Sequence, residues 1–110
     1  MDNFKDLVQR RRSVRKFTEQ SIKADDLQTI LRAALMSPTG KSVRGWHFVV
    51  VDDKDLLEKI SLCRSMGSQF LAGAAVAIVV LGDRDASDVW CEDASLAALS
   101  MQYQAADLGL

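Results

Sequence analysis

Apolar side chains recur with the spacing of an amphipathic helix in the stretch before Pro38. They occupy positions i, i+3, i+4, i+7 and i+8, which form one stripe along a helix: Leu27, Ile30, Leu31, Ala34 and Leu35. Asp25 and Asp26 fall in the first turn, where negative charge is favourable. Pro38 is expected to end the helix, because the residue before a proline disfavours helical conformation. The pattern predicts a helix with one buried face.

A longer helical pattern runs from about residue 87 to residue 107. One stripe carries Trp90, Ala94, Ala97, Met101, Ala105 and Leu108, and further apolar side chains lie off it: Val89, Leu96, Leu99 and Tyr103. The helix is therefore apolar most of the way round, which is typical of a helix at the centre of a large core. In a chain of this size, we expect that centre to be shared between two subunits.

Two apolar segments have the length and composition of strands. Residues 46–51 are rich in aromatic and β-branched side chains, and residues 75–81 are apolar throughout. The second pattern predicts a strand that is buried on both faces. Neither an internal repeat nor a linker interrupts the chain, so we expect residues 1–110 to form a single domain.

Shorter helices are expected at two further places. Asp2 or Asn3 can cap the first, whose apolar positions are Phe4, Leu7 and Val8. Residues 14–17 lose this spacing and are expected to be extended. Asp53 can cap the second helix, whose apolar positions are Leu56, Leu57, Ile60 and Cys63. Residues 64–73 predict a loop with a single helical turn.

The composition is that of a soluble globular chain, with 48% hydrophobic and 26% charged residues, so disorder is not expected. The net charge of −1 argues against general nucleic-acid or membrane binding, which needs a basic excess. No window approaches the roughly 18–20 apolar residues of a membrane span. The N-terminal residues lack the apolar region of a secretion signal. We therefore expect a cytoplasmic protein.

Few residues have the types and spacings of known catalytic or metal sites. The two cysteines, Cys63 and Cys91, form no Cys-x-x-Cys motif, so we expect buried, reduced thiols and no metal site. His47 is interpreted as a packed strand residue rather than a base. The chain also lacks a Gly-x-Ser-x-Gly elbow, a Walker loop and a Gly-x-Gly-x-x-Gly turn. Asp52 and Asp55 flank Asp53 at an expected strand exit and helix cap, which favours a structural role for all three.

Five basic residues lie within seven positions: Arg10, Arg11, Arg12, Arg15 and Lys16. Arginine offers several donors in a fixed fork that matches a phosphate, and Ser13 adds a hydroxyl group. The segment could therefore grip a phosphate where it leaves the first helix. The alternative is a solvated basic patch that complements the negative end of the helix dipole.

A second candidate is the polar loop from Ser37 to Ser42. It supplies hydroxyl groups and backbone amides, and Gly40 allows the backbone to approach a ligand closely. Such loops bind planar or anionic ligands, although the loop alone is a weak signal.

These two segments stand in order with other short motifs. Residues 11–17 are Arg-Arg-Ser-Val-Arg-Lys-Phe, residues 34–39 are Ala-Leu-Met-Ser-Pro-Thr, and residues 45–48 are Gly-Trp-His-Phe. Asp93-Ala94 lies near the start of the last helix, and Leu108-Gly109-Leu110 follows its end. In this order, over essentially the whole chain, the motifs resemble the signature of the flavin-dependent nitroreductase family.

The resemblance implies an α+β fold, with helices around a small central β-sheet and a long core helix at the interface of a homodimer. It implies FMN at that interface, with Arg11, Arg12 and Ser13 on the phosphate and ribityl chain. Arg15 would lie near the pyrimidine edge of the flavin, where a cation stabilises the reduced ring. The other subunit would cover the flavin with Pro38, Thr39, Gly40 and Ser42.

The implied activity is a ping-pong oxidoreduction on the flavin, with no catalytic side chain. NAD(P)H reduces FMN and leaves, and a nitroaromatic, a quinone or a similar acceptor takes its place. The family usually has Asn, Gln and Pro where this chain has Ser42, Arg44 and Gly45, and Arg44 could favour anionic or polar acceptors. Family members also continue past Leu110, so the chain is expected to lack a C-terminal part. The alternatives are a non-enzymatic phosphate-ligand or flavin-binding module and an inactive dimerisation fragment.

Overall fold

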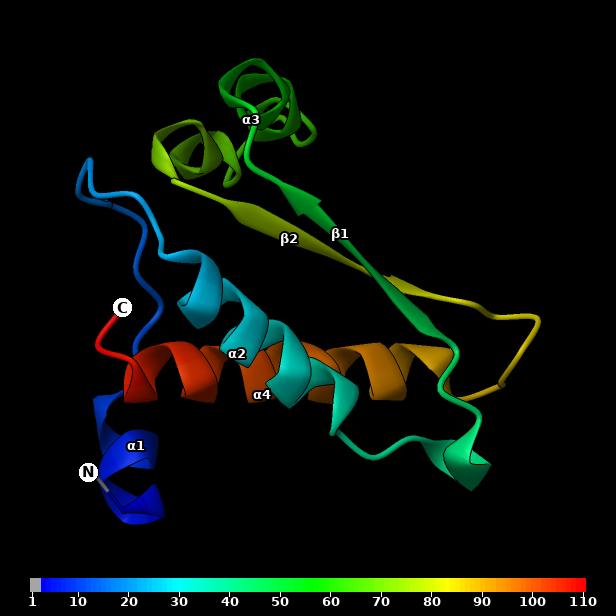
Figure 1. Ribbon diagram of the computed structural model, residues 1–110. Helices are drawn as coiled ribbons and strands as arrows, with labels where there is room; N and C mark the ends of the chain where they lie inside the picture. The colour runs from blue at the N-terminus through cyan, green and yellow to red at the C-terminus, as the bar shows by residue number, and fades with distance from the viewer. Residues whose placement is uncertain (1–2) are drawn as a thin grey trace. The chain divides into compact units, whose positions relative to one another are not determined.

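The computed structural model describes residues 3–110, which form four α-helices, two 3-10 turns and a two-stranded sheet (Figure 1). In chain order these are α1 (Phe4–Arg10), α2 (Ala24–Leu35), η1 (Gly40–Ser42), β1 (Trp46–Val51), α3 (Lys54–Ser61), η2 (Gln69–Gly73), β2 (Ala77–Gly82) and α4 (Trp90–Asp107). The α+β class expected from the sequence is confirmed, as are the long last helix and the small sheet.

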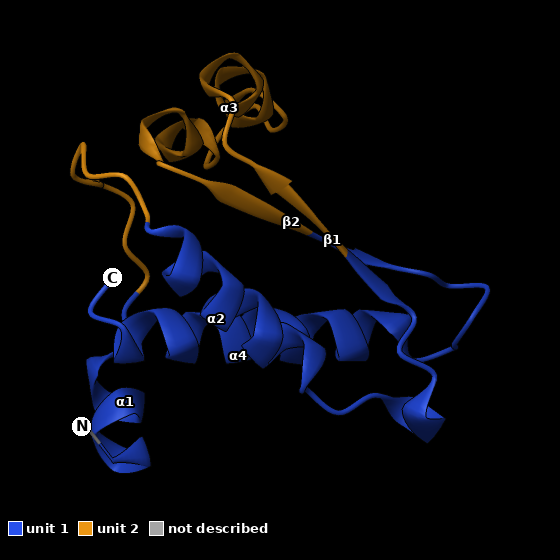
Figure 2. Ribbon diagram, in the orientation of Figure 1, with its two compact units in different colours: residues 1–12, 23–47, 80–110 blue, residues 13–22, 48–79 orange. Residues whose placement is uncertain are grey.

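The chain divides into two compact units, coloured separately in Figure 2. The first unit contains the residues up to 12, 23–47 and 80–110, and the second contains 13–22 and 48–79. β1 and β2 each begin in one unit and end in the other. That the whole chain is one domain stays a prediction.

In the first unit, α2 and α4 pack together around small side chains. Ala34 of α2 and Ala97 of α4 are fully buried, and Ile30 and Met101 are nearly so. Alanine lets two helix backbones approach closely, so Ala34 and Ala97 fit the contact between these helices. The short helix α1 also packs on α4, with its Phe4 ring edge-on to Tyr103 at 5.6 Å between centroids.

The second unit is built around α3 and η2. Asp53 caps α3 as the sequence predicts, because its Oδ1 accepts from the backbone N–H groups of Asp55 and Leu56. Leu57 is the buried anchor of the helix. Segment 13–22 is tied to this unit by the Phe17 ring, which lies 6.1 Å from the ring of Phe70.

A hydrogen bond between Ser61 and Ser68 links the last residue of α3 to the residue just before η2. Both side chains are buried, and the Ser68 hydroxyl group donates to the carbonyl oxygen of Ser61 at 2.7 Å. The same hydroxyl oxygen accepts from the N–H of Arg64 at 3.3 Å. The buried polar groups are therefore paired, as burial requires, and the turn from residue 62 to residue 68 is fixed at its base.

The helices lie where the sequence predicts them, but several side chains that were predicted to be buried are exposed. Leu35, at the end of the predicted stripe of α2, is 56% exposed. β2 is half-buried rather than covered on both faces, and its Leu81 is exposed. On α4, Leu96 and Leu99 are exposed. A chain of this size buries only about two-thirds of its surface, so one copy leaves such apolar faces open.

Three single-residue predictions are wrong. Cys63 lies beyond the end of α3 rather than on its apolar face, and both its thiol and that of Cys91 are exposed. His47 is exposed on β1 rather than packed.

Residues 14–17 form neither a helix nor a strand, in line with the expected loss of helical spacing. For the first helix, Asn3 is the observed cap, whereas Asp2 lies outside the described residues.

Two further findings concern residues 3–110. Within this range, no helix is long and apolar enough to cross a membrane. Nor does the range contain a group of three or more His, Cys, Asp or Glu side chains that could hold a metal ion.

Candidate functional site

The loop between α2 and β1 has an unusual backbone. Lys41, Ser42 and Arg44 all have positive φ angles, of 54°, 56° and 56°. This left-handed region is unfavourable for residues with a side chain, and it persists where the surroundings hold the backbone in place. Such strain is concentrated at ligand-binding and catalytic loops. The loop is therefore a stronger candidate site than its sequence alone suggested.

Three hydrogen bonds fix this loop within the first unit. The N–H of Gly40 donates to Oδ1 of Asp93 on α4 at 3.0 Å. The N–H of Arg44 donates to the Thr39 hydroxyl oxygen at 3.1 Å, and the carbonyl oxygen of Gly45 accepts from the Asp83 N–H at 2.7 Å. The loop is held at its start, across its middle and at its end.

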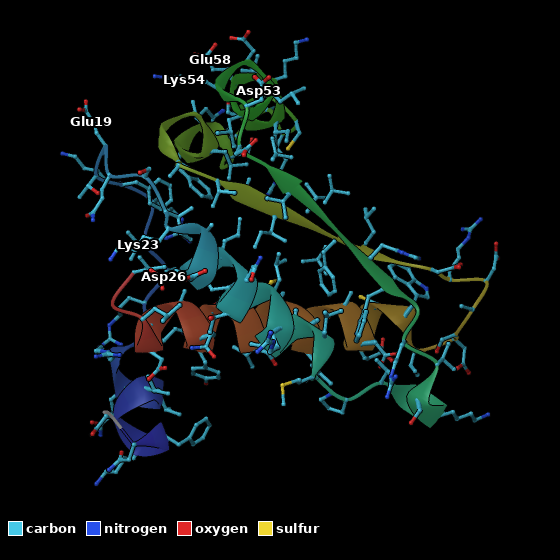
Figure 3. All side chains as sticks on the ribbon, viewed as in Figure 1. Glu19, Lys23, Asp26, Asp53, Lys54 and Glu58 are labelled. Atoms are coloured by element: carbon cyan, nitrogen blue, oxygen red, sulfur yellow. The ribbon has the colours of Figure 1, made fainter. Side chains whose placement is uncertain are left out.

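A cavity of about 380 Å³ lies beside the loop, within the first unit. Its lining comes from Gly40, Lys41 and Val43 on one side and from residues 86–89 on the other. The second unit has a larger cavity of about 660 Å³, next to segment 13–22 and the start of α3. Glu19 and Lys54 line this second cavity, and Figure 3 labels both.

Two residues of the basic cluster, Arg10 and Arg12, bind the C-terminal ends of two helices. Arg10 donates to the carbonyl oxygen of Ala106 near the end of α4. Nη1 of Arg12 donates to the carbonyl oxygen of Gln9 in the last turn of α1, at 2.5 Å. Cations are favourable at these negative helix ends. Stabilisation of helix C-termini therefore explains the positions of Arg10 and Arg12 without a ligand.

Arg11 differs from its neighbours because its partner is a side chain. Its Nη1 donates to Oε1 of Gln102 on α4 at 3.3 Å. A guanidinium group has five N–H donors, so this bond occupies only a part of its capacity. The donor chemistry of Arg11 and Arg12 therefore fits a phosphate group, which accepts several such bonds.

The structure places the predicted site residues in three groups. Arg11 and Arg12 directly follow α1 in the first unit, and Ser13 and Arg15 are exposed in the second unit. The loop residues belong to the first unit: Pro38, Thr39, Gly40 and Ser42. Pro38 and Ser42 are exposed, whereas Thr39 and Gly40 are half-buried.

Within one chain, Arg11 and the loop contact different turns of α4. Arg11 contacts Gln102, and Gly40 contacts Asp93, nine positions earlier. A helix rises 1.5 Å per residue, so these contacts are roughly 13–14 Å apart along its axis. A small phosphate group cannot touch both sets of residues in one copy of the first unit.

Sequence reasoning missed the roles of Asp93 and Gln102. Asp93 stands in the sequence motifs only as half of Asp93-Ala94, and no motif contains Gln102. A weak signal for Asp93 was present, because it is an acidic residue inside the most apolar helical pattern of the chain. Gln102 carries no such signal, since glutamine is ordinary on an exposed helix face.

Comparison with known proteins gives a consistent result. Residues 8–63 match the model of the nitroreductase family. An FMN-dependent nitroreductase from Clostridium difficile R20291 superposes with a TM-score of 0.92 at 45% identity, covering 94% of this chain and 60% of that one. A nitroreductase with bound FMN from Bacteroides fragilis NCTC 9343 has a TM-score of 0.80 at 25% identity, covering 99% and 67%.

A curated relative from Archaeoglobus fulgidus carries the provisional name NADH dehydrogenase/NAD(P)H nitroreductase. It is 35% identical over 108 residues, which are 94% of this chain and 62% of the relative. The chain thus spans less than two thirds of the length of this relative and of the Clostridium difficile protein.

Proposed function

Because the chain belongs to the nitroreductase family, we propose that it is part of an FMN-dependent oxidoreductase. In this proposal NAD(P)H is the electron donor, and nitroaromatics, quinones or similar small molecules are the acceptors. The observation that carries the proposal is the phosphate-type donor set of Arg11 and Arg12, in a chain that superposes on one FMN-dependent nitroreductase at a TM-score of 0.92. When bound, FMN would supply the hydride chemistry, as cofactors generally do.

The chain's own residues would bind and orient this cofactor. Arg11, Arg12 and Ser13 would hold the phosphate and ribityl chain through charge-assisted hydrogen bonds. Arg15 would place a positive charge near the pyrimidine edge of the flavin, which stabilises a negatively charged ring. No side chain of this set needs to exchange a proton for these roles.

The strained loop would complete the site from a second copy of the chain. Thr39, Gly40 and Ser42 would cover the flavin of the partner subunit, and Pro38 would shape the loop. In one copy Arg11 and Gly40 contact α4 nine positions apart, so a phosphate group on Arg11 would lie away from that copy's own loop, which is compatible with this division. The site would then be incomplete without a homodimer.

Loss of one arginine tests the phosphate assignment. We expect Arg11→Ala to weaken FMN binding at least tenfold, because a hydrogen bond to a charged group contributes about 1.5–3 kcal/mol. Quenching of flavin fluorescence during titration of the full chain measures this. Arg32→Ala is the matched control, since it removes the same charge from an exposed position on α2. Equal affinities for the Arg11→Ala variant and the unmodified chain would refute the assignment.

Mixed dimers test whether two subunits share the site. Arg11→Ala and Gly40→Ala chains are each expected to bind FMN weakly. If two subunits share each site, a mixed dimer has one site with both changes and one site with neither. The unchanged site combines Arg11 of the Gly40→Ala chain with the loop of the Arg11→Ala chain. About half of the sites in mixed dimers should then bind with the unmodified affinity. If mixing restores no binding, each chain holds its own flavin.

Turnover separates the enzyme from a binding module. The flavin-loaded protein should oxidise NADPH or NADH when a quinone is present, and this oxidation should follow the bound flavin content. Stoichiometric FMN binding without oxidation of either nucleotide would favour a non-enzymatic flavin-binding module. Protein that stays colourless after FMN is added and the excess removed would contradict the proposal that the chain binds FMN.

A further inference from the structure

Asp93 is the most deeply buried charged side chain that the proposed site leaves unexplained. It is 5% exposed and lies in the first turn of α4. Its Oδ1 accepts from the Gly40 N–H, whereas its buried Oδ2 has no hydrogen-bond partner among residues 3–110. A half-satisfied buried carboxylate is unfavourable. Its presence therefore calls for a role that offsets this cost.

The bond to Gly40 stands immediately before the strained backbone. Gly40 begins η1, and Lys41 and Ser42 follow it with positive φ angles. A left-handed residue with a side chain costs about 1–2 kcal/mol, so two in succession need support from their surroundings. The charged acceptor of Asp93 provides that support from α4. The positive end of the helix dipole in turn favours the carboxylate at this position.

The packing around Gly40 limits how the loop can move. A Cβ atom built on Gly40 would lie 2.5 Å from Cγ2 of Val89, which precedes α4. The backbone of Gly40 is thus pressed against the start of α4, with the Asp93 hydrogen bond on its N–H. Side-chain packing and a charge-assisted bond together define one position for the loop.

We propose that Asp93 is a positioning residue that locks residues 39–44 in their observed conformation, in which Lys41, Ser42 and Arg44 are left-handed, and so prepares the loop for flavin. This inference rests on the proposed function for its ligand, but the locking itself concerns the free protein. Asp93 does not touch the cofactor in this proposal. It acts through the backbone of Gly40, which directly follows Thr39 and precedes Ser42 by two positions.

Limited proteolysis of the flavin-free chain tests the lock directly. Trypsin cuts after Lys41 and Arg44 when the loop opens, and cleavage after the exposed Lys23 serves as an internal reference. We expect Asp93→Ala to raise the ratio of loop cleavage to Lys23 cleavage by about tenfold, because the loop loses a bond to a charged acceptor. Mass spectrometry of the early fragments measures the ratio.

Conservative and unrelated variants separate locking from general stability. Asp93→Asn retains an oxygen that can accept from Gly40, so its ratio should stay within about threefold of the unmodified chain. Ser95→Ala removes a hydroxyl group that bonds only within α4 and should change nothing. Met101→Ala weakens the buried core of the same unit and should speed cleavage at Lys23 and the loop alike.

The outcomes distinguish this inference from the proposed function. An unchanged ratio in Asp93→Ala would overturn the lock, as would an Asp93→Asn ratio as high as that of Asp93→Ala. If the lock holds and the unmodified chain binds FMN, Asp93→Ala should also weaken FMN binding several-fold, with Asp93→Asn close to normal. If the lock holds but the unmodified chain binds no FMN, the proposed function fails and the role of Asp93 in the loop remains.

Discussion

At the scale of single residues, the loop after α2 shows how local strain and a distant contact depend on each other. Lys41, Ser42 and Arg44 adopt positive φ angles although each has a side chain. Gly40 belongs to the same loop but has no positive φ. A glycine is needed there because a Cβ atom would overlap the side chain of Val89. The missing Cβ allows close packing, and the close packing brings the Gly40 N–H to Asp93.

The close approach at Gly40 leads to a stability prediction. Gly40→Ala should destabilise the protein by about 1–3 kcal/mol, because the new Cβ would sit 2.5 Å from Val89 Cγ2 and force it to move. Urea unfolding followed by Trp fluorescence measures the change. Gly73→Ala is the control, since a Cβ there has nothing within 4 Å. Equal losses in the two variants would mean that the Val89 contact is unimportant.

At the scale of elements, helix ends are decided by short-range interactions. Asn3 caps α1 and Asp53 caps α3, each through its side-chain oxygen and a backbone N–H two or three residues later. Figure 3 labels Asp53 just before α3, and Lys54 and Glu58 on the helix itself. By contrast, α2 and α4 have no side-chain cap, and their stability comes from packing against each other. Helices that pack against each other can form without a side-chain cap, because packing supplies most of the stability of a helix.

The cap of α3 gives a second stability prediction. Asp53→Ala should lower the free energy of unfolding by about 1 kcal/mol, whereas Asp53→Asn should cost much less, because asparagine caps helices about as well. Thermal unfolding followed by circular dichroism measures both variants. Asp52→Ala removes a neighbouring exposed carboxylate outside the helix and serves as control. A loss in Asp53→Asn that equals the loss in Asp53→Ala would point to charge rather than capping.

At the scale of the whole molecule, apolar surface is left open in a single copy. Leu96 and Leu99 of α4 are 44% and 39% exposed, although the same helix buries Ala97 and Met101. Leu35 and Met36 at the end of α2 are exposed as well. Soluble monomers rarely leave large contiguous apolar patches open. These side chains are candidates for the subunit contact that the proposed shared site requires.

A charge placed on this surface tests the proposed dimer. Leu99→Glu should convert the protein to a monomer, because a carboxylate buried without a partner at the contact is strongly unfavourable. Sedimentation velocity gives the oligomeric state. Gln28→Glu adds the same charge at an exposed polar position of α2 and should leave the state unchanged. A monomeric unmodified chain, or a Leu99→Glu chain that still dimerises, would contradict the proposed role of α4.

The sequence by itself determined the positions of the helices and strands and the family to which the chain belongs. The spacing of Leu27, Ile30 and Ala34, the cap at Asp53 and the proline at position 38 act over one or two helical turns, so their effects can be predicted without the rest of the molecule. The short motifs likewise indicate the family from the chain alone, and the match to the family model over residues 8–63 confirms that family.

Only the tertiary structure decided which apolar side chains are buried and how the loop is held. Cys63, Cys91 and Leu35 were expected to be buried and are exposed, because burial depends on which surfaces meet and not on the pattern of one segment. Gly40 and Asp93 stand 53 positions apart in the sequence, so no local rule predicts their hydrogen bond. The same holds for Arg11 and Gln102, which lie 91 positions apart. Contacts between distant residues follow from the packing of α2 and α1 on α4, and they arise only once those helices have come together.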